Sequence, residues 1–366
     1  MEDWLPDADT AVVPRIVMAT LAALFVVLAT AGGAEARSSV SRSWAAPQIA
    51  AVVDAGLMAP TVGEFRPDDP LTWSELSIVV ASLGGIPPVK APDRLVTVRE
   101  LDAQLVSLVG LRSAARGIRV AALVVGLSPR PWLGTETVAR MLGLRLNHDR
   151  GHELLELQLG QPATRAEAAF SIARVLALDA TTVETVRAAV TEFTPPMFDR
   201  WQRTILSRAL RFVGSPYVWA GTSERPQRLS GRLVPGGFDC SGLVWRVFKL
   251  EPFAGAPRLA GMLKGRTTYA MSAEVAPPAR VRWDELQPGD LVFFGARGER
   301  SRPAEVGHMG IYFGEGWMLH SSRFGTTLVP MTGWFETSFA WGRRLLAEAG
   351  LDAANGAPVL ANRAMP

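Results

Sequence analysis

The chain has little cysteine, histidine and lysine. Its 366 residues contain one cysteine, Cys240, and only four histidines. A single thiol cannot form an intramolecular disulfide, so a disulfide-stapled fold is excluded. Lys90, Lys249 and Lys264 are the only lysines, and the net charge is just +3 with no basic cluster. A nucleic-acid-binding surface is therefore not predicted.

Length and composition predict several folded domains. A chain of 366 residues exceeds one ordinary core and suggests two or three domains. Its hydrophobic content of 48% favours packed structure over long disorder.

The N-terminus predicts export. Arg15 precedes an apolar run at 16–31, and Ala34-Glu35-Ala36 follows as a cleavage pattern. The acidic residues before Arg15 fit a signal peptide poorly, which suggests a later start near Val13. An uncleaved anchor is the alternative. In both cases the bulk of the chain is expected outside the cytoplasm, where a lone cysteine needs a reason.

An internal repeat follows the apolar run. Three Thr-x-x-Glu boxes each predict a helix start, because the threonine and glutamate side chains can satisfy each other's backbone N–H groups. The boxes occupy 72–75, 97–100 and 164–167, and each opens an apolar segment of helical period, at 76–83, 101–111 and 168–178. A further helix is predicted at 44–55, before a turn-rich loop.

The repeat resembles the S-layer homology domain of bacterial surface proteins over about residues 43–180. The residues that carry the resemblance are Trp44, Gly56, Gly63, Phe65, Pro67, Pro70, Thr72 and Glu75. The third box, Thr164-Arg165-Ala166-Glu167, fits best, whereas Trp73 and Val98 replace the family's arginine in the other two. The resemblance implies that Arg165 helps to bind an anionic cell-wall polymer. Ordinary capped helices are the alternative interpretation.

His148 and His152 lie four residues apart, a spacing that could serve a metal on a helix. Gly151 and the polar surroundings favour a loop instead, and no third ligand is evident. We therefore predict no metal site.

The surroundings of Cys240 predict a nucleophile. Gly236-Gly237 lead to it, and an apolar helix is expected at 243–248, so that Cys240 lies in the first helical turn. A helix N-terminus and a nearby imidazole both lower a thiol pKa from its usual value near 8.5 and favour the reactive thiolate. A structural buried cysteine is the alternative.

His308 and His320 are predicted to lie on one face of a hairpin. Strands are expected at 311–313 and 317–319 around a three-residue loop, Gly314-Glu315-Gly316. His320 then lies opposite Gly310 and diagonal to His308, within hydrogen-bonding reach. We predict His308 as the general base and His320 as the residue that orients it.

Four ordered segments resemble the NlpC/P60 family of cell-wall cysteine peptidases. They are residues 214–221, 238–244, 288–294 and 307–312, with Ala220 where glycine is usual and a long segment at 222–237. The resemblance implies a papain-like fold, no cofactor, and cleavage of peptidoglycan stem peptides between γ-D-glutamate and the diamino acid. It also implies that the Tyr217 hydroxyl supports the thiol. Arg225, Arg228 and Arg232 suit the carboxylates of such peptides, or belong to a solvated loop.

We predict an α+β protein, an NlpC-type cysteine peptidase domain behind an all-helical repeat domain. The functional prediction is a secreted, wall-associated peptidoglycan hydrolase whose repeats bind an anionic wall polymer. An inactive wall-binding protein and an amidase or acyltransferase on the same fold are the alternatives. The predicted segments are an export segment or anchor (1–36), repeats (37–190), a linker (191–200), a peptidase domain (201–345) and a tail (346–366).

Overall fold

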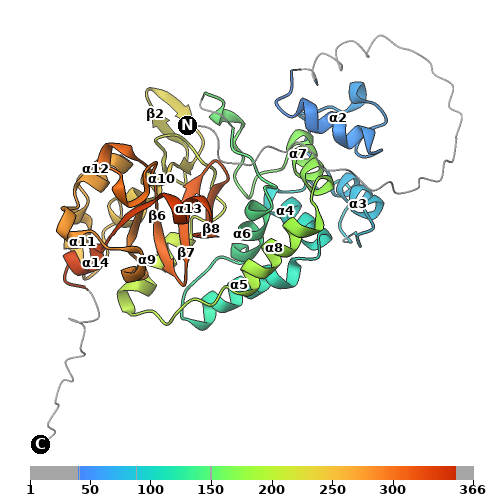
Figure 1. The fold of residues 1–366 in the computed structure, drawn as a ribbon. Coiled ribbons are helices and arrows are strands. Elements are labelled where there is room, and N and C mark those ends of the chain that lie inside the picture. The colour runs from blue at the N-terminus through green and yellow to red at the C-terminus, as the bar shows by residue number, and fades with distance from the viewer. Residues whose placement is uncertain (1–39, 41, 88, 149–150, 352–366) are drawn as a thin grey trace, which may run out of the picture.

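The computed structural model describes residue 40 and residues 42–87, 89–148 and 151–351. Within them, a helical region runs to Thr191, and a region of helices packed on an antiparallel sheet begins at Arg200. The two regions lie side by side (Figure 1). The predicted α+β fold class is confirmed. The export segment predicted at 1–36 lies outside the described residues, within which no helix is long and apolar enough to cross a membrane.

The helices predicted after the three boxes are present. Each begins at the residue after the box threonine and buries an apolar face. In the described helical region the helices are α2 (Ala46–Asp54), α3 (Trp73–Ser82), α4 (Val98–Leu108), α5 (Arg112–Val124), α6 (Leu133–Met141), α7 (Arg165–Leu176) and α8 (Ala180–Thr191).

The capping differs among the boxes. The Thr72 and Thr97 N–H groups donate to Glu75 and Glu100 at 2.9 and 3.0 Å, as predicted. In the third box the Thr164 hydroxyl accepts from the Glu167 N–H at 3.2 Å, but the Glu167 carboxylate turns instead to Arg145, at 2.8 Å. The reciprocal pair predicted there does not form, because a buried guanidinium holds the carboxylate.

A closed ring of three backbone hydrogen bonds joins the boxes. The bonds are made by the residue before each box threonine. The Leu71 N–H donates to the Ala163 carbonyl, the Ala163 N–H to the Val96 carbonyl, and the Val96 N–H to the Leu71 carbonyl, each at 2.8 Å. Because each of the three segments is both donor and acceptor once, they are related by an approximate threefold axis. The sequence repeat is therefore a threefold structural repeat.

The second region contains both helices and antiparallel β-strands. Its helices are α9 (Arg200–Leu210), α10 (Cys240–Phe248), α11 (Pro257–Met262), α12 (Thr268–Ala273), α13 (Trp334–Ser338) and α14 (Leu345–Glu348). The main sheet has the order β8-β7-β6-β5-β9, with β5 (Leu291–Gly295), β6 (Val306–Gly314), β7 (Trp317–Ser322), β8 (Gly325–Pro330) and β9 (Phe339–Arg343). Two short antiparallel pairs join β1 (Thr222–Ser223) with β4 (Gly237–Phe238) and, between them in the chain, β2 (Gln227–Leu229) with β3 (Arg232–Val234).

Alternate residues of a strand point to opposite faces of the sheet. In the main sheet both sets of side chains are buried, each in a different core. Phe293 and Ile311 belong to the main core, which also contains the apolar residues of α10. Phe294 belongs to a smaller core that includes Phe335 of α13. This layering sets α10 and α13 against opposite faces of the strands that carry the histidines.

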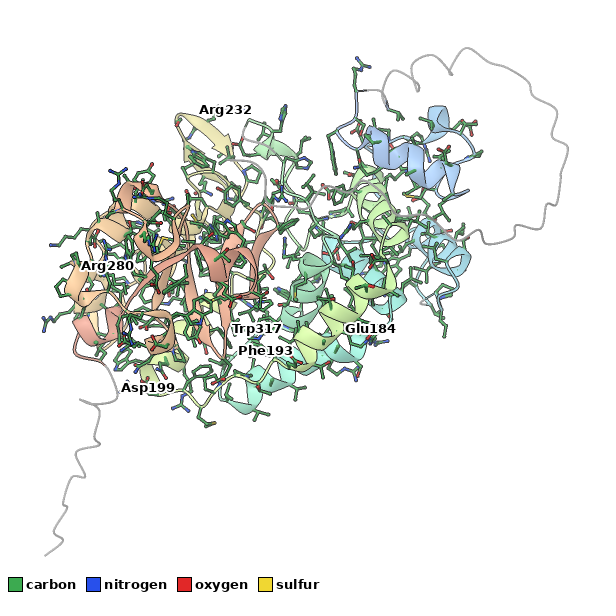
Figure 2. The ribbon with its side chains drawn as sticks, in the orientation of Figure 1. Glu184, Phe193, Asp199, Arg232, Arg280 and Trp317 are labelled. Atoms are coloured by element: carbon green, nitrogen blue, oxygen red, sulfur yellow. The ribbon has the colours of Figure 1, made fainter. Side chains whose placement is uncertain are left out.

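The segment predicted as a linker, 191–200, packs on the sheet. Phe193 is 3% exposed, and its ring lies 4.9 Å from that of Trp317 and 5.6 Å from that of Phe313 (Figure 2). Asp199 ends the segment by accepting the N–H groups of the first turn of α9. The connection between the regions is thus anchored at both ends.

Candidate active site

Cys240 is the first residue of α10. Asp239 caps this helix: its Oδ1 accepts from the Gly242 N–H and, at 3.1 Å, from the Ser241 hydroxyl. Gly242 is required because a Cβ there would collide with the carbonyl oxygen of Gly221. The Asp-Cys-Ser-Gly run therefore places a half-buried thiol at a helix N-terminus, as the sequence predicts.

Polar groups surround the thiol. The Thr268 hydroxyl lies 3.3 Å from Sγ, and the backbone N–H groups of Ser241 and Met309 also reach the sulfur. Met309 is the neighbour of His308, so the strand that carries the predicted base also contacts the predicted nucleophile. Thr268 was missed by the sequence reasoning, since no local spacing links the start of α12 to Cys240.

The prediction that the pKa of the Cys240 thiol is lowered is wrong. Burial raises the pKa of Cys240 to about 11, and the Asp239 carboxylate adds to this effect, against the hydrogen bonds from Thr268, Ser241 and Met309. Desolvation of the thiolate outweighs the helix N-terminus. The Cys240 side chain is therefore a neutral thiol at pH 7.

The histidine pair has the predicted register by a different route. Gly310 pairs with His320, and the His308 Nε2 lies 2.8 Å from the His320 Nδ1. The loop is shorter than predicted, because Gly314 pairs with Trp317 and leaves Glu315-Gly316 as the turn. A bulge between Tyr312 and Gly314 restores the register, so the two histidines share a face.

Aromatic rings enclose the two imidazoles. The Phe335 ring lies 5.3 Å from the His320 ring and 6.2 Å from the His308 ring, and Trp334 lies 6.3 Å from His308. Burial lowers the pKa of His308 to about 4. Burial, together with the charge that His308 would carry, holds the pKa of His320 well below 6.5. Both rings are therefore neutral at pH 7, the form that a general base requires.

Opening this cover should move the acid limb of the pH–rate profile. A base acts only when neutral, so kcat/KM should fall as pH drops through the pKa of His308, near 4. Phe335→Ala admits water, which stabilises the imidazolium and should shift the limb upward toward about 6.5. The measurement is kcat/KM from pH 3.5 to 8.

Phe339→Ala is the matched control, because Phe339 belongs to the same small core but contacts the Trp283 and Phe294 rings. Its acid limb should stay in place. An unmoved limb in the Phe335 variant would mean that another group controls the rate at low pH.

Tyr217 lies close to Cys240. It forms a parallel bridge with Phe238, and burial, with the charges of Cys240 and Asp239, raises the pKa of its hydroxyl. Ala220, three residues on, has φ of 62°. This left-handed conformation explains why glycine is usual at that position.

Arg266 is a second residue that sequence reasoning missed. Its NH1 donates to the Ser241 hydroxyl at 2.7 Å, and its NH2 donates to the Ala220 carbonyl at 3.0 Å. It also pairs with Asp239 at 3.3 Å. Arg266 thus joins the nucleophile helix to the loop that follows Tyr217.

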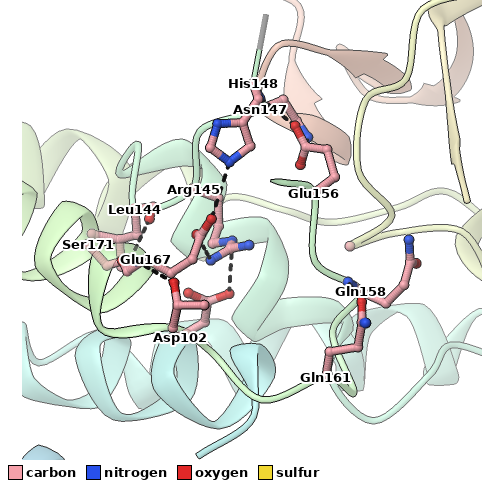
Figure 3. A network of polar contacts seen from close by, with 12 residues as sticks. Asp102, Leu144, Arg145, Asn147, His148, Glu156, Gln158, Gln161, Glu167 and Ser171 are labelled. Atoms are coloured by element: carbon pink, nitrogen blue, oxygen red, sulfur yellow. Dashed lines mark hydrogen bonds and ion pairs between the residues drawn. The ribbon is translucent and has the colours of Figure 1, made fainter. Parts of the chain in front are cut away.

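The predicted polymer-binding residue, Arg165, lies inside the helical region. Its side chain is 3% exposed; it pairs with Glu75 and donates to the Phe65 and Met58 carbonyls at 2.7 Å each. Each box glutamate has such a guanidinium partner. Arg94 binds Glu100 at 2.6 Å. Arg145 binds Glu167 at 2.8 Å (Figure 3). Arg94 and Arg145, which lie outside the boxes, thereby supply the guanidinium groups that Trp73 and Val98 lack.

His148 joins this network rather than pairing with His152. Its Nε2 lies 3.4 Å from the Glu167 carboxylate (Figure 3). Its ring meets the Trp44 ring edge-on, with the centroids 4.5 Å apart. In the part of the chain that the structure describes, no group of three or more histidine, cysteine or acidic side chains could hold a metal ion. Arg225, Arg228 and Arg232 lie exposed on or beside the β2–β3 hairpin.

Comparisons with known proteins agree with this architecture. Residues 214–342 match the NlpC/P60 family, and residues 38–75 match the S-layer homology domain. The C-terminal region is thus an NlpC/P60 domain, and both predicted resemblances are confirmed. The S-layer homology match covers the first repeat, whereas the hydrogen-bond ring includes all three boxes.

Three similar proteins illustrate the range of the match. A probable endopeptidase of Mycobacterium tuberculosis is 34% identical over 35% of this chain and 26% of its own length. The gamma-D-glutamyl-L-lysine dipeptidyl-peptidase of Bacillus subtilis is 33% identical over 35% of this chain and 34% of its own length. A crystal structure of an NlpC/P60 family protein from Bacillus cereus is 27% identical, covers 40% of each chain and has a TM-score of 0.30. The chain thus spans about a quarter to a third of the two curated relatives.

Proposed function

We propose that this protein is a secreted peptidoglycan hydrolase, a cysteine endopeptidase that cleaves stem peptides through Cys240, His308 and His320. The observation that carries the proposal is the 2.8 Å contact between the two imidazoles, on a strand whose Met309 N–H reaches the Cys240 sulfur. A lone cysteine at a helix N-terminus, in contact with the strand that carries a neutral imidazole, suits nucleophilic catalysis.

The tautomers of the pair follow from the contact. When the His308 Nε2–H donates to the His320 Nδ1, the His308 Nδ1 is left as the proton acceptor. His320 then fixes both the tautomer and the ring of the base, the role that a carboxylate has in serine peptidases.

The reaction has two steps. Sγ attacks the scissile carbonyl, the thiol proton passes to His308 Nδ1 and then to the leaving amine, and a thioester remains. Water, deprotonated by His308, attacks the thioester and restores the thiol. Because the thiol pKa is about 11 and that of His308 about 4, proton transfer accompanies the attack rather than precedes it. The N–H of Cys240 and the hydroxyl of Tyr217 stabilise the developing oxyanion and the sulfur.

The proposed substrate is the amide between γ-D-glutamate and the diamino acid of the stem peptide. The name of the Bacillus subtilis relative supports this bond. The full chain should release peptides that begin with the diamino acid from purified peptidoglycan, as determined by product mass. Release of intact stem peptides would indicate an amidase, and acyl transfer without hydrolysis an acyltransferase. Wall binding with no product would leave the inactive wall-binding protein.

We further propose that the threefold helical region holds the enzyme at the cell surface by binding an anionic wall polymer. The S-layer homology match and the predicted export segment support this localisation. Arg165 is the candidate ligand, although its donors are engaged within the protein.

A pair of variants distinguishes polymer binding by Arg165 from its structural role in the ion pair with Glu75. Arg165→Ala should weaken sedimentation with purified cell walls several-fold, because it removes a cation. Glu75→Gln breaks the same ion pair but keeps the guanidinium. The sedimented fraction and the melting temperature are measured for both, in the Cys240→Ala background to prevent digestion. Equal losses in both variants would mean that Arg165 acts through the fold alone.

A further inference from the structure

Several hydrogen bonds join the helical region to the region that begins at Arg200, here called the catalytic region, and the side chains of Arg140 and Gln158 reach three of its loops. Arg140, on α6, donates through NH1 to the Phe324 carbonyl and through NH2 to the Gly214 carbonyl, the latter at 2.7 Å. Gln158 donates through Nε2 to the Gly236 carbonyl at 2.6 Å. These bonds join residues that belong to different sequence domains.

The accepting carbonyls lie close to the proposed catalytic residues in sequence. Gly214 precedes Tyr217 by three residues, Gly236 precedes Cys240 by four, and Phe324 follows His320 by four. Each side-chain donor from the helical region therefore holds the backbone of a segment that presents one catalytic side chain.

The held segments are also bonded to one another. The Gly214 N–H donates to the Thr326 carbonyl of β8 at 2.8 Å, and the Phe238 N–H donates to Pro216 at 3.1 Å. The Ser321 hydroxyl, next to His320, donates to the Phe238 carbonyl at 2.8 Å. A displacement of one loop is thus transmitted to the other two.

Arg140 is built into this interface. It is 5% exposed and lies 3.7 Å from Glu136, one turn earlier on α6. Gly325 permits its approach, since a Cβ there would collide with the guanidinium, and a Cβ at Gly214 would collide with Leu159. The catalytic region thus has glycines at two points where side chains of the helical region approach its backbone closely.

We propose that the helical region, through Arg140 and Gln158, is part of the catalytic unit: it positions the loops that carry Tyr217, Cys240 and His320. This inference rests on the proposed function for its kinetic test, and on the lone thiol for a second test that needs no activity. Arg140 and Gln158 are positioning residues, because they act through backbone carbonyls and not on the reacting atoms.

Two full-length variants test the proposal. Gln158→Leu removes one donor at similar volume and should lower kcat on a soluble stem peptide about five-fold, the factor expected for one hydrogen bond, with KM little changed. Arg140→Lys keeps the charge beside Glu136 but cannot reach both carbonyls, and should lower kcat about ten-fold. A soluble peptide excludes any effect of wall attachment.

Matched controls make the same chemical changes away from the interface. Gln104 is half-buried on α4, and Arg187 donates to the Gly110 carbonyl within the helical region. The controls are therefore Gln104→Leu and Arg187→Lys. Both controls should keep the wild-type kcat. Melting temperatures are measured for all four variants, and rates are compared well below them.

Alkylation of Cys240 by iodoacetamide is the second readout. Because this is the only cysteine, the rate reports this thiol alone. Loosened loops admit more water to the half-buried thiol, so the pH midpoint of alkylation should fall in Gln158→Leu and Arg140→Lys and stay unchanged in the controls.

The outcomes separate the two proposals. A wild-type chain that cleaves no peptide contradicts the proposed function, whereas the alkylation profiles still test the positioning. Folded interface variants with wild-type kcat and wild-type alkylation would overturn the inference. If Arg140→Lys does not fold, Gln158→Leu decides.

Discussion

Cys240→Ala should abolish the release of peptides from peptidoglycan, with a loss of kcat on the order of 10⁶-fold. In the proposed mechanism the thiol forms the acyl-enzyme, and without it that covalent route is lost. The fold should survive, because Asp239, Ser241 and Gly242 hold the start of α10 independently of Cys240. Product mass spectrometry on purified walls measures the loss.

Cys240→Ser is the control for geometry. The hydroxyl occupies nearly the same place but is far less acidic than the thiol, so this variant should also be almost inactive. Both variants should melt within a few degrees of the wild type. Peptide release by Cys240→Ala at the wild-type rate would refute the cysteine mechanism.

His308→Ala should lower kcat at least about 10²- to 10⁴-fold, the range for general acid–base catalysis. Adding His308→Ala to Cys240→Ala should cause little further loss, because the two residues act as one proton-transfer unit and their effects do not add. Steady-state kinetics on a soluble stem peptide gives the comparison.

His320→Ala should be milder than His308→Ala, because the nucleophile and the base remain and only the orientation of the base is lost. His320→Asn and His320→Gln should recover part of the activity, since an amide can accept the hydrogen bond from His308 Nε2. Unchanged turnover in His320→Ala would reduce the triad to a pair of Cys240 and His308.

The histidine pair shows what strand alternation can predict. Side chains alternate between the two faces of a strand, which predicts that His308 and His320 share one face of the sheet. The observed register agrees. The turn was one residue too long in the prediction, and the bulge was absent from it. These two differences cancel, because each shifts the register by one residue. Alternation carries no signal for a bulge.

Properties that depend on tertiary packing could not be read from the sequence. The thiol pKa rises because α12 and the strands bury Cys240, an effect that the local helix start does not contain. The aromatic cover from α13 comes from residues after both histidines and follows no motif. Likewise, Arg94 and Arg145 replace the missing box arginines from positions that no repeat alignment points to.

The hydrogen-bond ring of Leu71, Val96 and Ala163 fixes the number of repeats. An open array of repeats can gain or lose a copy, because each unit contacts only its neighbours. In a closed ring the first and third segments bond directly, so deleting one box leaves two segments with unmatched backbone groups, and a fourth has no place. Closure also joins distant parts of the helical region, so it should unfold in one cooperative step and not repeat by repeat.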